Sequence, residues 1–327
     1  MRNLFTRPLL LVTAFTLLSA ACGGSDDDQA ASSIVESTET TTTTAAETTT
    51  EAVITDFPIS LDTLNGTVTI VDRPQRILSL SATATEILFA VGAGAQVIAV
   101  DSFSNYPAEA PITDLSAFEP NFEAISTYEP DLVITSFDPE NALTEAFSLL
   151  DVPVLIQGGA LSLEDTYRQI AEIGLATGNV DEAAAVVGQI RQRVDAALAR
   201  TTGTDSLRIY HELDDTYFSV SSASFLGDIY NQLGFENIAD PADPDGFGYP
   251  QLTPESIVEA DPQLIIITDQ VGYTAQDVAA RPGWDAISAV SNGAIEQVDA
   301  DIASRWGPRI AEYVEQMADI ATAVKTG

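Results

Sequence analysis

Side chains that could catalyse a covalent reaction or bind a bare metal ion are scarce in this chain. Its 327 residues include one histidine, His211, and one cysteine, Cys22. This pair is too small for a structural zinc site built from Cys and His. The sequence also contains no nucleophile-elbow, phosphate-loop or zinc-protease motif. Carboxylates such as Asp214 and Asp215 leave one enzymatic alternative open, a secreted α/β enzyme that uses acid and base chemistry.

His211 follows Tyr210 and precedes three acids, at the end of a predicted strand. One histidine is too few for a protein that captures bare zinc or manganese. We therefore predict no metal site, no bound cofactor, and a histidine at the surface or at the edge of a cleft. A haem-binding protein with one His and one Tyr as axial ligands is a second alternative.

Aromatic residues are the most informative group, because several follow predicted strands or lie in loops. In open α/β sheets, ligands bind beyond the carboxyl ends of the strands, where aromatic rings stack on flat or apolar ligands. Core packing is the alternative for each ring. We predict ligand contacts for Phe103, Phe118, Phe137, Phe218, Tyr249 and Trp306.

Two of only 13 basic residues, Arg305 and Arg309, share one short segment. A guanidinium can pair with the carboxylate or another anionic group of a ligand, and we predict this role for Arg305. Arg309 follows Gly307 and Pro308 at a predicted helix start. We expect it to pair with a local carboxylate of the protein.

Two glutamates, Glu123 and Glu255, fall in the first turns of two predicted short helices. Asn121 and Thr253 precede them as N-caps. An acid in the first turn also interacts favourably with the helix dipole. Helix capping therefore explains both glutamates locally, and it is compatible with a second role in contacting a partner protein.

The elements that must position these residues alternate from about residue 57 onward. Predicted strands are 77–80, 97–100, 132–135, 154–156, 207–210, 264–267 and 295–298, and predicted helices are 83–91, 140–150, 163–177 and 305–324. This alternation predicts two α/β lobes with mostly parallel sheets. The longest helical pattern, 181–200, keeps its apolar residues on one face and predicts a stiff helix joining the lobes.

An internal repeat supports two related lobes. Residues 123–134 are EAISTYEPDLVI and residues 255–266 are ESIVEADPQLII. Each copy predicts a short helix, a proline and a buried strand.

The first 22 residues resemble a bacterial lipoprotein signal, with Arg2 and Arg7 before an apolar run too short to span a bilayer. Small residues precede Cys22, so we predict cleavage before this cysteine and its lipidation. An ordinary signal peptide is the alternative. Residues 23–56 are rich in Thr and Glu without Lys or Arg, which predicts a disordered acidic linker.

The charge balance excludes whole classes of partner. Lys and Arg number 13 against 49 Asp and Glu, which gives a formal net charge of −36. Nucleic-acid binding is excluded because the phosphates would not be neutralised. A folded surface that docks on anionic lipid is disfavoured for the same reason.

An ordered set of segments carries a family resemblance. The segments ILSLSATATEILFAVGAG and PNFEAISTYEPDLVI, with Pro107 between them, resemble the N-lobe of substrate-binding proteins for iron chelates and cobalamin. The segments SFLGDIYNQLGFENIAD and GYPQLTPESIVEADPQLIII resemble their C-lobe, and residues 304–310 resemble their last cleft loop. The likeness covers about residues 68–324.

The resemblance implies an extracytoplasmic, lipid-anchored monomer that captures a ferric siderophore or a cobalamin-like chelate. It would deliver this ligand to an ABC permease dimer with its ATPase and do no covalent chemistry. The resemblance favours Phe103, Phe118 and Tyr249 as ligand contacts. It implies that Glu123 and Glu255 each meet an Arg of the permease. A haem-binding variant and a lipoprotein that has lost transport are alternatives.

These patterns together divide the chain into five parts. They are a signal peptide, 1–22, a linker, 23–56, an N-terminal lobe, 57–178, an inter-lobe helix, 179–202, and a C-terminal lobe, 203–327.

Overall fold

The computed structural model of the protein describes residues 56–201 and 206–326, which all belong to the unit Glu51–Gly327. The predicted signal peptide, Cys22 and linker residues 23–55 lie outside the described residues.

The N-lobe is built on a parallel four-stranded sheet. Its strands are β3 (Ile77–Leu80), β4 (Val97–Val100), β5 (Leu132–Thr135) and β6 (Val154–Ile156). They pair in the order β4-β3-β5-β6. Every residue of β3 and β5 is buried, as in parallel sheets covered on both faces. The helices between these strands are α1 (Ala82–Ala90), α2 (Phe122–Ser126) and α3 (Ala142–Ser148).

A hairpin that the sequence analysis missed precedes this sheet. Strand β1 (Ile59–Thr63) pairs antiparallel with β2 (Gly66–Ile70). The Asn65-Gly66 pair in its turn is a strong local hairpin signal. Only Leu61 of β1 and Ile70 of β2 are buried, so the hairpin has too few apolar residues to stand out.

The C-lobe repeats the N-lobe topology. Its strands are β7 (Arg208–His211), β8 (Glu236–Asn237), β9 (Leu264–Thr268) and β10 (Ile295–Val298). They are parallel and lie in the order β10-β9-β7-β8. In both sheets the first strand lies between the second and the third, and the fourth lies outside the third. The C-lobe helices are α6 (Phe225–Gln232), α7 (Pro254–Ala260), α8 (Ala275–Ala279), α9 (Ser288–Ser291) and α10 (Ala300–Ser304).

The sequence repeat corresponds to equivalent parts of the two sheets. Helix α2 leads into β5 and helix α7 leads into β9, and these are the third strands of their sheets. The predicted order of helix, proline and buried strand is therefore confirmed at Pro130 and Pro262.

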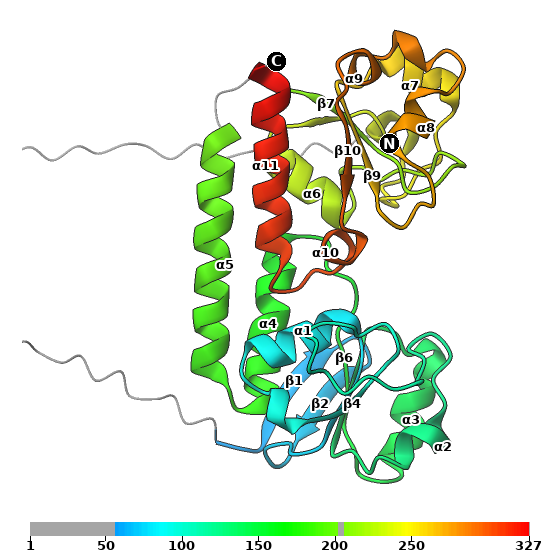
Figure 1. The fold of residues 1–327 in the computed structure, drawn as a ribbon. Coiled ribbons are helices and arrows are strands. Elements are labelled where there is room, and N and C mark those ends of the chain that lie inside the picture. The colour runs from blue at the N-terminus through cyan, green and yellow to red at the C-terminus, as the bar shows by residue number, and fades with distance from the viewer. Residues whose placement is uncertain (1–55, 202–205, 327) are drawn as a thin grey trace, which may run out of the picture. The chain divides into compact units, whose positions relative to one another are not determined.

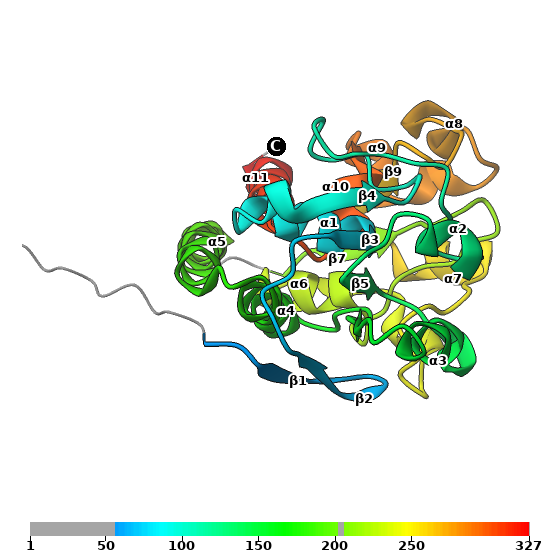
Figure 2. The ribbon, with the colours of Figure 1, turned by 90° about the horizontal axis from the view of Figure 1, so that it is seen from below.

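Three helices lie together beside the sheets, as Figures 1 and 2 show: α4 (Leu163–Thr177), α5 (Val180–Thr201) and α11 (Ile310–Thr326). The 22-residue α5 follows the last N-lobe strand and α4 and precedes the first C-lobe strand, which confirms the predicted joining helix. Ile190, Val194 and Ala197 of α5 are buried in the largest core cluster. None of the described helices has the length and apolar character of a membrane span.

The predicted helix over 305–324 begins later than expected. The chain forms α10, then a turn over 305–309, and only then α11. Pro308 has no N–H to donate and disfavours helical geometry in the residue before it. The described part of the chain also contains four short 3₁₀ turns: Gly94–Gln96, Pro139–Asn141, Asp240–Ala242 and Trp284–Ala286.

Candidate ligand-binding site

A pocket lies beyond the carboxyl ends of the N-lobe strands, where the sequence analysis expects a ligand. Ser81, Asp101 and Ser136 directly follow β3, β4 and β5 and line it. Its lining from the N-lobe is Leu80, Ser81, Ala82, Thr83, Asp101, Phe103, Ala117, Phe118, Ser136 and Phe137. From the C-lobe side, Gln270, Asp301, Ser304, Arg305 and Trp306 complete it.

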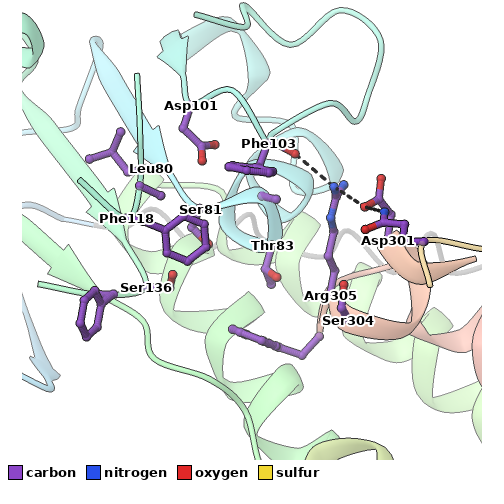
Figure 3. Close-up of a pocket in the computed structure, with 15 residues that line it drawn as sticks. Leu80, Ser81, Thr83, Asp101, Phe103, Phe118, Ser136, Asp301, Ser304 and Arg305 are labelled. Carbon is purple, nitrogen blue, oxygen red and sulfur yellow. Dashed lines mark hydrogen bonds and ion pairs between the residues drawn. The ribbon is translucent and has the colours of Figure 1, made fainter. Parts of the chain in front are cut away.

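Three exposed phenylalanine rings of the N-lobe line this pocket. Phe103, Phe118 and Phe137 are 58%, 71% and 54% exposed. The rings of Phe103 and Phe118 meet edge to face, with centroids 5.7 Å apart, and Figure 3 shows them side by side near Ser81. Apolar rings left open to solvent at a pocket are typical of an interaction site.

Trp306 also lines the pocket, and it comes from a segment far along the chain from the loops that carry the phenylalanines. Its indole N–H donates to the side-chain oxygen of Gln169 on α4, at 2.9 Å. This hydrogen bond fixes the ring through its polar edge and leaves its apolar surface for packing. The structure therefore brings Trp306, Arg305 and the three phenylalanines to one pocket.

Phe218 and Tyr249 do not line this pocket. They lie on a C-lobe ribbon in which residues 217–221 run antiparallel to residues 248–252. Phe218 pairs with Gln251 in this ribbon, and both aromatic rings are exposed.

A third aromatic residue, which was not predicted from the sequence, lies beside this ribbon. Phe247 is 81% exposed and lies between Gly246 and Gly248, both in the left-handed region. Asp243 accepts hydrogen bonds from the N–H groups of Phe247 and Gly248 at 2.9 and 2.8 Å. These hydrogen bonds help hold the pKa of Asp243 below its usual range, after the larger effect of the Ser221 hydroxyl. An aromatic residue between two glycines was the available signal for a presented ring.

Arg305 is buried and bound by the protein itself. Its guanidinium donates to Glu86 at 3.0 Å and to Asn105 at 2.8 Å. It also donates to the carbonyl of Phe103 at 3.1 Å and pairs with Asp301 at 3.0 Å. These partners compensate the charge of Arg305 within the protein. Arg305 braces the loop that carries Phe103, and its contact with a ligand stays a prediction.

Arg309 pairs with a carboxylate of the protein, as expected, but not with a local one, because its partner is 223 residues away in the sequence. Its Nε donates to Glu86 at 2.9 Å, and its guanidinium lies 4.2 Å from the ring centroid of Tyr106. The hydrogen bond to Glu86 is the main cause that raises the pKa of Arg309.

Asp101 brings a buried carboxyl to the same pocket. Burial raises its pKa, against the opposing effects of hydrogen bonds from the Ser104 hydroxyl and from the N–H groups of Phe103 and Ser104. The charge of Arg305 also opposes this rise in the pKa of Asp101, as the smallest of these effects.

The prediction of a surface or cleft-edge histidine is wrong. His211 is buried at the end of β7, and its Nδ1 lies 2.6 Å from the hydroxyl of Tyr230 on α6. Tyr230 in turn shares a 2.5 Å hydrogen bond with Tyr313 on α11. Burial lowers the pKa of His211 to about 4. Strand β7 lies between β8 and β9 in the C-lobe sheet, and its residues Ile209, Tyr210 and His211 are buried.

The N-lobe has a buried glutamate, Glu86, and the C-lobe has one as well, Glu212, whose burial was not predicted from the sequence. Glu212 is fully buried and binds the Arg281 guanidinium through both oxygens, at 2.6 and 2.7 Å. The hydroxyl of Tyr210 lies 3.1 Å from the same carboxylate, and Trp284 lies under the guanidinium at 4.6 Å. Neither charged residue lines the pocket.

The described residues provide no site for an uncomplexed metal ion. Among residues 56–201 and 206–326, no group of three or more His, Cys, Asp or Glu side chains is arranged to hold a metal ion. Asp214, offered above as an acid or base, accepts hydrogen bonds from Thr216, and neither it nor Asp215 is among the described residues of the pocket lining.

The predicted helix caps are confirmed. The Asn121 side chain accepts the N–H of Ala124 at the start of α2. Thr253 does the same for Ser256 in a reciprocal capping box at the start of α7. Glu123 and Glu255 lie in the first turns that follow, and both are exposed.

The protein has two α/β lobes, each with a parallel β-sheet, a helix that joins them and a pocket at the strand ends. These features define a two-lobe substrate-binding protein. The family model described as periplasmic binding protein matches residues 77–302, and the chain belongs to this family. It is 31% identical to the uncharacterized ABC transporter substrate-binding lipoprotein YvrC of Bacillus subtilis, over 80% of this chain and 85% of that protein.

Two further relatives carry names that concern a ligand. The chain is 28% identical to a cobalamin-binding protein of Halobacterium salinarum, over 80% of this chain and 74% of that protein. A solved structure of a possible iron-binding periplasmic solute-binding protein from Staphylococcus epidermidis aligns with a TM-score of 0.66 at 26% identity, over 76% of this chain and 99% of that one.

Proposed function

We propose that this substrate-binding protein captures a metal chelate, a ferric siderophore or a cobalamin-like compound, and delivers it to an ABC import permease. The observation that carries the proposal is the pocket with three exposed phenylalanine rings at the ends of parallel strands. Rings of this kind suit the flat or apolar parts of a large ligand. The names of the relatives from Halobacterium and Staphylococcus support the same ligand class.

Both lobes contribute to ligand contact in this proposal. Phe103, Phe118 and Phe137 hold the ligand from the N-lobe, and Trp306 and Arg305 border it from the C-lobe side. We further propose that Phe218 and Tyr249 reach the ligand from the C-lobe ribbon. Their exposure and their place after β7 and β8 support this contact.

The exposed glutamates form the proposed contact with the permease. Glu123 and Glu255 occupy equivalent helix starts in the two lobes, and each would meet an Arg on one half of a permease dimer. The protein acts as a monomer in this scheme and does no covalent chemistry. Delivery then depends on one acidic contact from each lobe.

The proposal also includes a lipid anchor at the N-terminal side and a division of the chain into parts. We propose lipidation at Cys22, a linker over residues 23–56, lobes over 57–178 and 203–327, and an inter-lobe helix over 179–202. The lipoprotein nature of the Bacillus relative supports an extracytoplasmic protein tethered to the membrane. Cys22→Ala should move the protein from the membrane fraction to the soluble one. An unchanged membrane fraction at equal yield would contradict the anchor.

Titration calorimetry tests the ligand class. We expect cyanocobalamin or a ferric hydroxamate to bind with a dissociation constant in the nanomolar to micromolar range, roughly −8 to −12 kcal/mol. Phe103→Ala should weaken that binding about tenfold. Leu149→Ala, which changes an exposed apolar residue outside the pocket lining, should leave it unchanged. Binding of a free amino acid or sugar in place of every chelate would refute the proposal.

Uptake assays test the docking role separately. Glu123→Arg and Glu255→Arg should leave ligand affinity unchanged and reduce uptake strongly, because each places a positive charge opposite a permease Arg. Glu259→Arg, on the same helix as Glu255 and also exposed, is the matched control and should keep normal uptake. Reduced ligand affinity with normal uptake would instead place these glutamates in binding.

A further inference from the structure

Four paired charges meet at the edge of the pocket. Asp301 and Arg305 line it, whereas Glu86 and Arg309 lie outside its lining. Glu86 on α1 is buried and accepts hydrogen bonds from both Arg305, at 3.0 Å, and Arg309, at 2.9 Å. Asp301 pairs with Arg305 at 3.0 Å. Two carboxylates therefore compensate two guanidinium groups, and Figure 3 shows Arg305 joined to Asp301 and to the Phe103 carbonyl.

The rest of the pocket supplies acids and no further base. Of the described residues that line it, Arg305 alone is basic, whereas Asp101 and Asp301 are acidic. Asp101 is buried with the Ser104 hydroxyl as its partner and lies outside the four-charge set. The pocket wall is consequently neutral or negative and has no spare positive charge for a ligand anion.

We propose that Glu86 determines ligand specificity by neutralising Arg305 and Arg309, so that the pocket selects metal chelates of zero or positive charge and rejects anionic ones. This inference rests on the proposed function and names the substrate class of the same pocket. Ferric hydroxamates and corrinoids fit this class. Ferric catecholates and carboxylate-rich chelates do not.

The selection follows from desolvation and from repulsion. An anionic chelate would lose water on entering the pocket without gaining a positive partner, and an unpaired charge in a low-dielectric site is costly. The carboxylates of Asp101 and Asp301 add repulsion. The net charge of −36 on the whole chain acts in the same direction, although salt screens it beyond about 8 Å.

A purely structural role for Glu86 makes a different prediction. Glu86→Gln removes one negative charge and keeps an oxygen that can accept from the guanidinium groups. Arg305 retains its hydrogen bonds to Asn105 and to the Phe103 carbonyl, which brace the aromatic loop. If Glu86 acts through its charge, this variant should bind anionic ligands more tightly and cationic ligands more weakly. A purely structural role predicts no such opposite changes.

The test compares three probes of different charge by titration calorimetry: cationic ferrioxamine B, neutral cyanocobalamin and an anionic ferric tris-catecholate. The wild-type protein should bind the cationic or the neutral probe at least about tenfold more tightly than the anionic probe. Glu86→Gln should strengthen binding of the anionic probe about tenfold and weaken binding of any cationic probe. The neutral probe should change least.

Two further variants serve as an alternative test and as a control. Asp301→Asn removes a charge from the same set at a partly exposed position, so it tests the inference if Glu86→Gln fails to fold. It should move the preference in the same direction. Glu164→Gln, in an exposed pair with Arg191, should not change it. Thermal unfolding by circular dichroism confirms that each variant is folded.

The outcomes separate this inference from the proposed function. Tight binding of all three probes without a charge preference overturns the inference and leaves the chelate function standing. An unchanged preference in folded Glu86→Gln and Asp301→Asn also overturns it. Failure of every chelate to bind the wild-type protein overturns the proposed function and the inference together.

Discussion

The N-lobe and the C-lobe share one strand order, yet each uses its buried glutamate differently. Glu86 of the N-lobe pairs with Arg305 and Arg309, which lie after the last C-lobe strand. Glu212 of the C-lobe pairs with Arg281 of its own lobe, among aromatic rings. A repeated topology therefore fixes where strands end, while the side chains decide whether a buried charge serves the pocket or the core.

The exposed aromatic residues differ between the lobes in the same way. The N-lobe rings of Phe103, Phe118 and Phe137 line the pocket, whereas Phe218 and Tyr249 of the C-lobe belong to a ribbon outside its lining. We infer that the N-lobe presents a formed half-site. From the C-lobe side, Asp301, Arg305 and Trp306 line the pocket, and ligand contact by Phe218 and Tyr249 is a prediction.

The largest expected effect comes from breaking the C-lobe ion pair. Glu212→Ala leaves Arg281 buried without its carboxylate, which should lower the free energy of unfolding by about 3–5 kcal/mol. Glu164→Ala breaks an exposed pair and should cost less than about 1 kcal/mol. Urea denaturation measures both. Equal losses would show that Glu212 is not a core element of the lobe.

The next effect depends on pH and belongs to the C-lobe, because His211 is the one histidine of the chain. Its folded pKa of about 4 lies below the ordinary value of 6.5, so the unfolded chain takes up a proton first as the pH falls. Stability should be full above about pH 6.5 and fall by about 3 kcal/mol toward pH 4.

His211→Gln removes this titration and should flatten the part of the stability profile between these pH values. Urea unfolding of both proteins at pH 7 and pH 4.5 measures the difference in slope. Asp101 of the N-lobe has the opposite sign, because burial raises its pKa and a falling pH relieves that cost. Parallel profiles for the wild-type protein and the variant would show that His211 does not titrate as described.

Aromatic substitutions measure separately how much each lobe contributes to ligand binding. Phe118→Ala and Tyr249→Ala should each weaken chelate binding about tenfold, since an aromatic contact contributes about 1 kcal/mol beyond the buried area. Calorimetry on Phe103→Ala combined with Phe118→Ala should show a larger loss than either alone. If Tyr249→Ala has no effect, the C-lobe ribbon takes no part in binding.

The smallest effect concerns the equivalent helices α2 and α7. Thr253→Ala removes half of a reciprocal capping box and should cost about 1 kcal/mol, whereas Asn121→Ala removes a single cap and should cost about 0.5 kcal/mol. Denaturation midpoints of the two variants rank the caps. The reverse order would mean that Pro254 already fixes the start of α7 without the box.

Local patterns were sufficient for most of the fold. Strands β3, β4, β5, β6 and β10 and helix α4 have the predicted bounds, and β7 is displaced by one residue. The caps at Asn121 and Thr253 and the repeat before β5 and β9 were likewise visible in short segments. Hydrophobic period, capping residues and prolines act over a few residues, so a single sequence displays them directly.

Long-range contacts account for what the sequence left undetermined. Glu86 and Arg305 are 219 residues apart, and no spacing within either segment indicates that they meet. For this reason the prediction from the sequence treated Arg305 as a group that binds a ligand anion. The burial of His211 likewise depends on Tyr230 of α6 and on α11 packing beside β7.

Two related α/β lobes, a joining helix and aromatic residues that follow the strands could all be predicted from short segments of the chain. Which rings share a pocket, and which charges are already compensated there, became clear from the folded chain alone. Periodicity and capping are local properties, whereas the electric field and the shape of a pocket arise from side chains that distant segments bring together.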